Sequence, residues 1–171
     1  MMMLPMPIAD LAKIGDELEA EGKVVRVLWQ RPESLAFVAR GRDYRSEFHI
    51  NPSDEIMYMI RGKMNLHFRE EDGTEGVSVL DEGQLIYTQS GIPHSPRFPS
   101  TDLLLVVERQ RNPGEIDRFH WYCPECDAFL HEETFVVDDY QKDPVSLAYK
   151  RFFDSEEFRT CNECGHTMPP P

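Results

Sequence analysis

The sequence predicts an all-β protein, a barrel or sandwich of antiparallel strands, with a short N-terminal helix and a small cysteine-rich metal-binding segment near the C-terminus. Short β-branched and aromatic runs follow one another through the first two thirds of the 171-residue chain, and turn residues separate them. Helical periodicity does not intervene between these runs. Four cysteines occur as two C-x-x-C pairs in the last third.

A chain of this length buries roughly two thirds of its unfolded surface, which is enough for one domain with a small appendage. The pattern breaks around Asn112-Pro113-Gly114, and every cysteine lies beyond that point. We therefore expect four parts: an N-terminal helix in residues 1–22, a barrel in 23–115, an appended four-cysteine metal-binding segment in 116–166 and a loose tail in 167–171.

The first element predicted is an amphipathic helix within residues 7–22. Ile8, Leu11, Ile14 and Leu18 recur at three- and four-residue spacing, and Gly22 supplies a stop. This helix is expected to cover one face of the sheet that follows it.

Strands are predicted in the residues that follow the helix. The runs occupy residues 23–31, 34–41, 56–70, 76–91 and 101–111, and the turns between them include Asn51-Pro52, Asp72-Gly73, Glu82-Gly83 and Gly91. Many short strands without connecting helices are typical of a barrel or a sandwich.

The charge balance narrows the classes of partner. Acidic residues outnumber basic ones by 31 to 18, which disfavours non-specific binding to nucleic acid phosphates or to an anionic membrane. The apolar runs fall short of the ~20 residues of a membrane span, and the first residues lack a basic region followed by a signal-type apolar core. We expect a cytoplasmic protein with a small-molecule partner.

Two histidines and one glutamate form a candidate metal site. The turn-forming stretch INPSD separates His49 from Glu55, so a hairpin can bring them together, and His94 follows another turn. Two imidazoles and one carboxylate are the ligand set that leaves positions open on Fe(II). The alternative is that these are ordinary half-exposed residues of a sheet.

The sequence stretches around His49, Glu55 and His94 resemble the two cupin motifs. The stretch GRDYRSEFHINPSDEIMYMIRG matches the first motif at Gly41, His49, Glu55 and Gly62. Glu47 stands where that motif has its first histidine, and the loop before Glu55 is one residue longer. The resemblance implies a cupin jelly-roll barrel.

The second cupin motif is echoed by GQLIYTQSGIPHSPRF. Gly83, Gly91 and His94 fall at the expected spacing, while Gln89 and Phe98 replace the usual proline and asparagine. The cupin fold hosts many functions, so the motifs alone do not choose among them.

Three longer stretches resemble the 3-hydroxyanthranilate 3,4-dioxygenase family, of the bacterial type with an appended metal segment. They are FHINPSDEIMYMIRGKM, IPHSPRF and VVERQRNPGEIDRFHWYCPEC, and the likeness extends from about residue 24 to Cys164. It implies a non-haem Fe(II) ring-cleaving dioxygenase in which His49, Glu55 and His94 hold the iron and dioxygen is the co-substrate.

The resemblance also implies a small aromatic substrate, 3-hydroxyanthranilate or a related 2-aminophenol. Two alternatives stay open: a related dioxygenase with a different aromatic substrate, and a non-catalytic metal-bound cupin that binds a small aromatic. Barrels of this kind often pair through their sheets, so a homodimer is expected.

Arg45 and Glu108 map by resemblance onto catalytic residues that also hold the substrate. Arg45 lies four residues before His49, which predicts the same strand face. Glu108 ends an apolar run, so a buried carboxylate that accepts a proton is expected there, on the opposite face from Arg109. The competing interpretation is a salt bridge from Glu108 to Arg109 or Arg111.

The chain departs from this family after the sequence HSP. The family normally has Gln-Arg at the two positions that are Arg97 and Phe98 here, so the arginine that binds the substrate carboxylate is shifted or lost. We expect Arg97 or Phe98 to contact the substrate. Because neighbouring strand residues point to opposite faces, only one of the two is expected to reach it.

The cysteines predict a second metal site of a different kind. Cys123 and Cys126 form one C-x-x-C pair, and Cys161 and Cys164 form another after an intervening 34 residues. Four thiolates favour a tetrahedral, closed site for structural Zn or Fe, which the resemblance makes rubredoxin-like. Two disulfides are the alternative.

Overall fold

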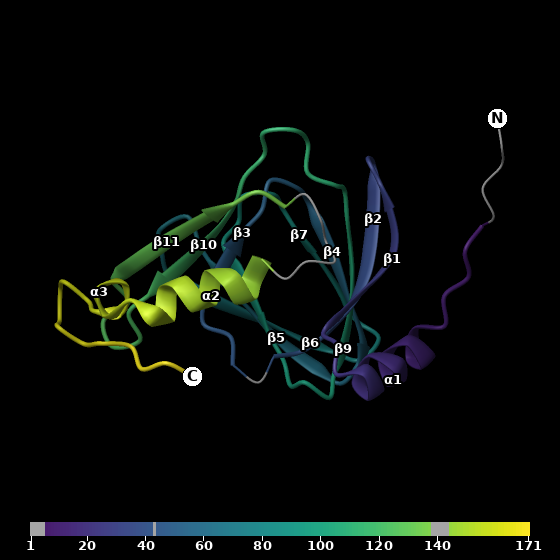
Figure 1. Ribbon diagram of the computed structural model, residues 1–171, viewed down its shortest axis with the longest axis horizontal. Helices are drawn as coiled ribbons and strands as arrows, with labels where there is room; N and C mark the ends of the chain where they lie inside the picture. The colour runs from purple at the N-terminus through teal and green to yellow at the C-terminus, as the bar shows by residue number, and fades with distance from the viewer. Residues whose placement is uncertain (1–5, 43, 138–143) are drawn as a thin grey trace.

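A computed structural model describes residues 6–42, 44–137 and 144–171 (Figure 1). Its elements are α1 (Leu11–Glu21), β1 (Val25–Arg31), β2 (Ser34–Arg40), β3 (Phe48–Ile50), β4 (Glu55–Arg61), β5 (Lys63–Arg69), β6 (Glu75–Asp81), β7 (Leu85–Thr88), β8 (His94–Arg97), β9 (Leu103–Glu108), β10 (Asp117–Tyr122), β11 (Phe129–Phe135), α2 (Pro144–Asp154) and α3 (Glu156–Arg159).

The strands form two antiparallel sheets that pack face to face. One sheet has the order β1-β2-β9-β4-β7 and the other the order β11-β10-β3-β8-β5-β6. Their inner faces share a core of apolar side chains: Met57, Met59, Met64, Leu66, Leu80, Phe98, Leu104 and Val106. The predicted all-β architecture of antiparallel strands is confirmed.

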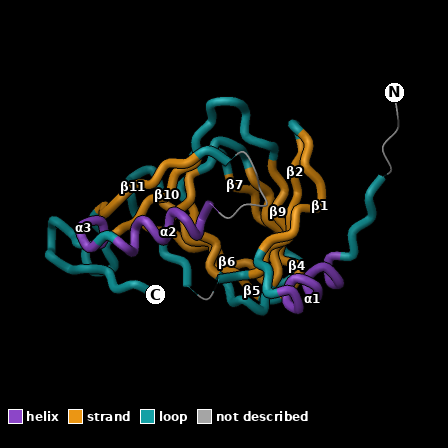
Figure 2. The backbone as a smooth tube through the Cα atoms, viewed as in Figure 1, coloured by secondary structure: helices purple, strands orange, loops and turns teal. Residues whose placement is uncertain are grey.

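Helix α1 closes one end of the sandwich, and α3 lies at the opposite end of the molecule (Figures 1 and 2). The Asp10 side chain caps the helix by accepting from the Lys13 backbone N–H, and Gly22 ends it in the left-handed conformation. Leu18 is fully buried against Val38 and Leu103. The expectation that Ile8 shares this face is wrong, because Ile8 precedes the cap and is exposed.

The sheet extends beyond the boundary predicted at residue 115. β10 lies within the segment expected to be an appendage, yet it pairs with β3 through Phe119 opposite His49, and β11 pairs with β10. Residues 117–135 therefore continue the six-stranded sheet, because the inward side of β10 supplies Phe119 and Trp121 to a buried cluster.

The predicted loose tail is also packed, at least as far as Met168. The Met168 backbone N–H donates to the Arg159 carbonyl at 2.9 Å. Its side chain is buried in the cluster that contains Trp121 and Phe152. An apolar contact of this kind gives the tail a fixed position that composition alone does not reveal.

Position 41 requires glycine because the backbone of Phe98 and Pro99 passes close to it. A Cβ at this position would lie 2.1 Å from the Phe98 carbonyl oxygen and 2.2 Å from that of Pro99. Gly41→Ala is therefore expected to lower the free energy of unfolding by about 1–3 kcal/mol, measured by urea denaturation.

Gly76→Ala is the matched control. The three atoms nearest to the added Cβ all belong to the Phe68 ring, with the ring tip at 2.5 Å, and this side chain can swing away about its Cα–Cβ bond. A smaller loss is expected. Equal losses in the two variants would show that backbone crowding at Gly41 is not what excludes a side chain.

Candidate active site

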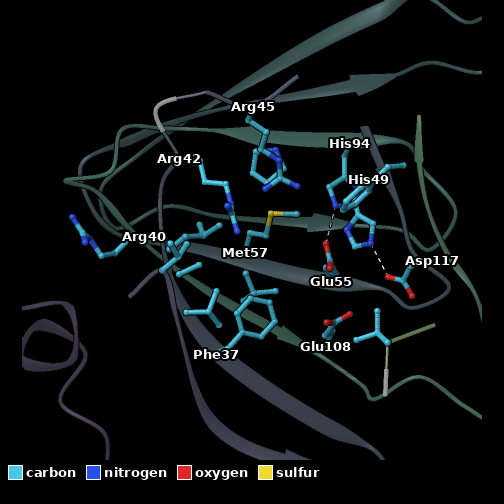
Figure 3. Close-up of a pocket in the computed structure, with 18 of the residues that line it drawn as sticks. Phe37, Arg40, Arg42, Arg45, His49, Glu55, Met57, His94, Glu108 and Asp117 are labelled. Atoms are coloured by element: carbon cyan, nitrogen blue, oxygen red, sulfur yellow. Dashed lines mark hydrogen bonds and ion pairs between the residues drawn. The ribbon is translucent and has the colours of Figure 1, made fainter. Parts of the chain in front are cut away.

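The two sheets bring the predicted metal ligands together. His49 of β3 pairs directly with His94 of β8 in the six-stranded sheet. Glu55 begins β4 of the facing sheet, after the turn that follows β3. In Figure 3 the three side chains converge from the two layers.

One ligand atom from each of these residues lies within 4.8 Å of the others, which is a spacing that a single metal ion can bridge. His94 Nε2 is 2.9 Å from a Glu55 carboxylate oxygen. His94 Nδ1 faces the Ile92 carbonyl at 2.8 Å, which fixes the ring so that Nε2 points at Glu55. The His94 and Glu55 side chains are only 2% and 6% exposed.

Charge and protonation suit a divalent cation. Burial lowers the pKa of His49, so its imidazole is neutral near pH 7 and able to coordinate. Burial opposes ionisation of Glu55, but interactions with His94, His49 and Arg111 hold the Glu55 pKa below its usual range. The donor set and its protonation state therefore fit Fe(II).

Asp117 and Arg111 form a second layer around these ligands. An Asp117 oxygen lies 2.7 Å from His49 Nε2. The Arg111 guanidinium donates to both Asp117 oxygens, at 2.7 and 2.8 Å, and its side chain is 3% exposed. Carboxylates that hold a ligating histidine in this way orient the ring.

Neither Asp117 nor Arg111 was predicted as part of the site. The sequence offers Arg111 only as a possible partner of Glu108, and the alternation in DRFHWY places Asp117 on the inward face with Phe119. That alternation is the signal that could have found Asp117.

Glu108 lies at the end of β9, buried, and it faces the same region. It accepts hydrogen bonds from Arg111 at 2.5 Å and from Ser53 at 2.7 Å. Arg109 points elsewhere and pairs with Glu115 at 2.6 and 2.7 Å. The predicted burial is thus observed, and so is the salt bridge to Arg111 that was the competing interpretation.

The Glu108 carboxyl is poised to exchange a proton. Burial, and then the negative charge of Glu55, raise its pKa to about 7, while Arg111 opposes the shift. Glu55, Glu108 and Asp117 together carry three carboxylates against the one guanidinium of Arg111. A divalent cation at the ligand cluster would offset the remaining negative charge.

A cavity of about 180 Å³ opens onto this cluster. An enclosed space of about 150 Å³ binds benzene in a protein core, so this volume fits one aromatic ring. Apolar walls come from both sheets: Phe37, Met57, Pro96, Phe98, Leu104, Val106, Phe119 and Phe135.

Three arginines line the cavity away from the ligand cluster. Arg40, Arg42 and Arg45 all belong to its lining, and in Figure 3 Arg42 and Arg45 extend toward its interior. Arg40 donates to the Ser100 carbonyl at 2.9 Å and points away from the ligands. The cavity thus joins a metal-type donor set to a cationic region through an apolar middle.

The structure separates Arg97 from Phe98. Phe98 is buried and lines the cavity, whereas Arg97 is absent from the described lining. Arg97 instead lies beside Glu75 at 3.9 Å and over the Phe48 ring at 5.4 Å. The alternation of strand residues explains this separation.

Arg45 reaches the cavity from a different backbone position than predicted. β3 begins at Phe48, so Arg45 lies in the irregular segment before the strand and does not share a strand face with His49. Its Nε is 2.7 Å from a carboxylate oxygen of the fully buried Glu47. The side chain is held by this ion pair.

The four cysteines gather at the far end of the six-stranded sheet. The Sγ atoms of Cys123 and Cys164 are 3.6 Å apart, and those of Cys126 and Cys161 are 3.5 Å apart. All four thiols are free, which excludes the disulfide alternative. A tetrahedral ion with sulfur at about 2.3 Å separates its ligands by about 3.8 Å, so the cluster fits Zn or Fe.

The two C-x-x-C turns share one backbone geometry. Cys123 N–H donates to Ala128 O and Cys161 N–H donates to His166 O, both at 2.8 Å. Asp127 and Gly165 follow the second cysteine of each pair with φ of 62° and 76°. Asp127 tolerates this conformation beside Arg69, whose guanidinium donates to it at 2.5 and 2.6 Å.

Within the described residues, no helix has the length and apolar character that crossing a membrane requires.

Several known proteins with similar sequences are named 3-hydroxyanthranilate 3,4-dioxygenases. A 3-hydroxyanthranilate 3,4-dioxygenase of Bacillus cereus is 36% identical over 144 residues, which cover 84% of this chain and 80% of the relative. The enzyme of the same name from Paraburkholderia phytofirmans is 33% identical over 143 residues, covering 83% and 81%.

Among solved structures, a cupin-2 domain protein of Shewanella frigidimarina aligns with a TM-score of 0.47 at 14% identity, over 57% of this chain and 92% of that one. The profile of the 3-hydroxyanthranilic acid dioxygenase family matches residues 21–153, and with the two relatives it shows that the chain belongs to this family.

Proposed function

We propose that this protein is an Fe(II)-dependent ring-cleaving dioxygenase that acts on 3-hydroxyanthranilate or a related 2-aminophenol. The observation that carries the proposal is the cavity that joins His49, Glu55 and His94 to a ring-sized apolar space. Family membership supports the same reaction class, since the relatives carry that name.

The iron would be held by one carboxylate and two imidazoles. When bound, Fe(II) supplies the open coordination positions that a ring with adjacent hydroxyl and amine groups and dioxygen require. Asp117 holds the His49 ring through its contact at 2.7 Å, and the Ile92 carbonyl holds the His94 ring at 2.8 Å. These contacts keep both ligands oriented.

The remaining side chains of the cavity would bind different parts of the substrate. Met57, Phe98 and Val106 would pack on the ring and exclude water. Glu108, whose pKa is raised to about 7, would accept the proton that the ring hydroxyl or amine releases on binding. A ring carboxylate would lie toward Arg42 and Arg45, which extend into the cavity.

A second ion, Fe or Zn, is proposed for the four-cysteine cluster. Its four sulfurs fill a tetrahedral shell, which leaves no position for a substrate and favours a rubredoxin-like, structural role. Four free thiols are kept in a reducing compartment, which supports a cytoplasmic location.

We propose a homodimer that forms through the outer faces of the strands. Large apolar side chains are exposed on the paired strands β4 and β7: Ile56, Leu85 and Tyr87. Exposed apolar residues gathered on neighbouring strands mark an interaction surface more often than a solvated one. Sedimentation equilibrium measures the state directly.

Removing a ligand from the His-Glu cluster should empty that site alone. Glu55→Ala and His94→Ala are each expected to abolish turnover and to lower the metal content by one ion while the ion of the four-cysteine cluster remains. Metal analysis and oxygen uptake measure the two effects. His120→Ala is the control, because His120 contacts Glu132 at 2.7 Å outside the cavity; full turnover in either ligand variant would refute the site.

Arg42→Ala should discriminate between substrates with and without a carboxylate. A lost charge-assisted pair costs about 1.5–3 kcal/mol, so KM for 3-hydroxyanthranilate should rise roughly tenfold to a hundredfold. KM for 2-aminophenol, which lacks the carboxylate, should change little. Initial rates of ring-absorbance loss measure both.

Arg97→Ala is the comparison variant, because Arg97 lies outside the described lining of the cavity. It should leave both substrates nearly unaffected. If KM for 3-hydroxyanthranilate rose with Arg97→Ala and not with Arg42→Ala, Arg97 and not Arg42 would be the residue that binds the substrate carboxylate.

Glu108→Gln should lower kcat/KM by about 10²–10⁴-fold with iron retained, because an amide cannot accept the proton. In the wild type only ionised Glu108 is competent, so kcat/KM should rise with pH through its pKa of about 7. That rise should vanish in the variant. Glu115→Gln removes a carboxylate that pairs with Arg109 nearby and serves as the control; an unchanged pH profile in Glu108→Gln would assign the proton to another group.

A further inference from the structure

Arg45 lies in the irregular segment before β3, so no strand pairing fixes its backbone. Arg45 lines the cavity and extends into it (Figure 3). Its Nε lies 2.7 Å from Glu47 Oε1, and the Arg45 and Glu47 side chains are 17% and 0% exposed. The position of the guanidinium therefore depends on Glu47.

The C-terminal segment supplies the second partner of Glu47. The hydroxyl of Tyr149, on α2, donates a hydrogen bond to Glu47 Oε2. The Ser46 backbone N–H donates back to the Tyr149 oxygen at 3.1 Å, and Trp121 Nε1 donates to Ser46 Oγ at 3.1 Å. Tyr149 thus contacts two consecutive residues next to Arg45.

Burying a carboxylate is costly unless a cation or a hydrogen-bond donor lies against its oxygens. Glu47 has the Arg45 guanidinium on one oxygen and the Tyr149 hydroxyl on the other. Burial raises the pKa of Tyr149, so the phenol remains a donor at neutral pH. Without that hydroxyl, Glu47 would have to move toward another donor, and Arg45 would follow it.

We propose that Tyr149 is a positioning residue for substrate binding: by holding Glu47, it fixes the Arg45 guanidinium in the cavity. The inference rests on the proposed function for the identity of the substrate, but the contacts from Tyr149 to Glu47 and from Glu47 to Arg45 do not depend on it. A long cationic side chain loses rotamer entropy when a ligand immobilises it, and a guanidinium that is already fixed has lost that entropy before the substrate arrives.

The same contacts connect the four-cysteine segment to the residues that hold Arg45. α2 lies in the chain between Cys126 and Cys161. Its Phe152 stacks on the Trp121 ring with centroids 4.3 Å apart and planes 9° apart. Trp121 in turn holds Ser46, so α2 reaches the segment of Arg45 through Tyr149 and through Trp121.

Tyr149→Phe removes the hydroxyl alone and leaves the ring beside Trp121 and Phe153. We expect the Kd of the iron-loaded protein for benzoate, a non-reacting aromatic carboxylate, to rise about fivefold to tenfold. KM for 3-hydroxyanthranilate should rise alike, while kcat at saturation and iron content stay unchanged. A residue with a merely structural role would lower thermal stability without this split.

Tyr44→Phe is the matched control. Tyr44 precedes Arg45, and its hydroxyl also joins the segment to the C-terminal part of the chain, at 3.9 Å from Met168 Sδ. This contact does not involve Glu47, so affinity should be retained. Equal losses in Tyr44→Phe and Tyr149→Phe would overturn the role of the Glu47 contact.

A double-mutant cycle with Arg45→Ala tests the route of the effect. If Tyr149 acts through Arg45, Tyr149→Phe should add nothing to the loss of affinity that Arg45→Ala causes. Additive losses would refute the proposal. Crystal structures of the wild type and of Tyr149→Phe give an answer that needs no substrate: the guanidinium should leave its wild-type position in the variant, and an unmoved guanidinium would overturn the inference even if ring cleavage were also disproved.

Discussion

The buried guanidinium of Arg111 is the interaction on which the site depends. Packing two sheets face to face brings Glu108 from one sheet and Asp117 from the other into a common interior, where two carboxylates repel each other and are poorly solvated. Arg111 bridges them, at 2.5 Å to Glu108 and at 2.7 and 2.8 Å to Asp117. Each carboxylate then has a further task, since Asp117 orients His49 and Glu108 faces the cavity.

The distribution of charge in the cavity follows from this arrangement. Around the ligand cluster the carboxylates of Glu55, Glu108 and Asp117 outnumber the buried guanidinium of Arg111. The excess of negative charge favours a divalent cation there. At the other end Arg42 and Arg45 favour an anionic substituent, and the apolar side chains between the two ends exclude water from both. An aromatic ring that carries metal-binding groups on one side and a carboxylate on the other matches this order of charges.

The C-terminal part of the chain is joined to the barrel by strand pairing and by side-chain contacts. β10 supplies both Asp117 to the site and Trp121 to the cluster beneath α2, because successive odd positions of the strand point inward. Arg69 of β5 stacks over the Tyr122 ring at 3.7 Å and pairs with Asp127 in the first C-x-x-C turn. The four-cysteine cluster is therefore connected to the sandwich through both its backbone and its side chains, which differs from the separate appendage that cysteine spacing suggested.

The sequence by itself determined the strand-rich fold, the helix within 7–22, the ligand candidates His49, Glu55 and His94, and the four cysteines as a set. These depend on local information: alternation, turn residues and short spacings that survive in a linear string. Only the tertiary structure decided that Phe98 and not Arg97 faces the cavity, that Arg42 accompanies Arg45 there, and that Arg111 joins Glu108 to Asp117. Tyr149 lies 102 residues from Glu47, and no periodicity links two residues so far apart. Partners of buried charges are chosen by which side chains the packed sheets and helices bring within reach, and that choice exists only once the chain has folded.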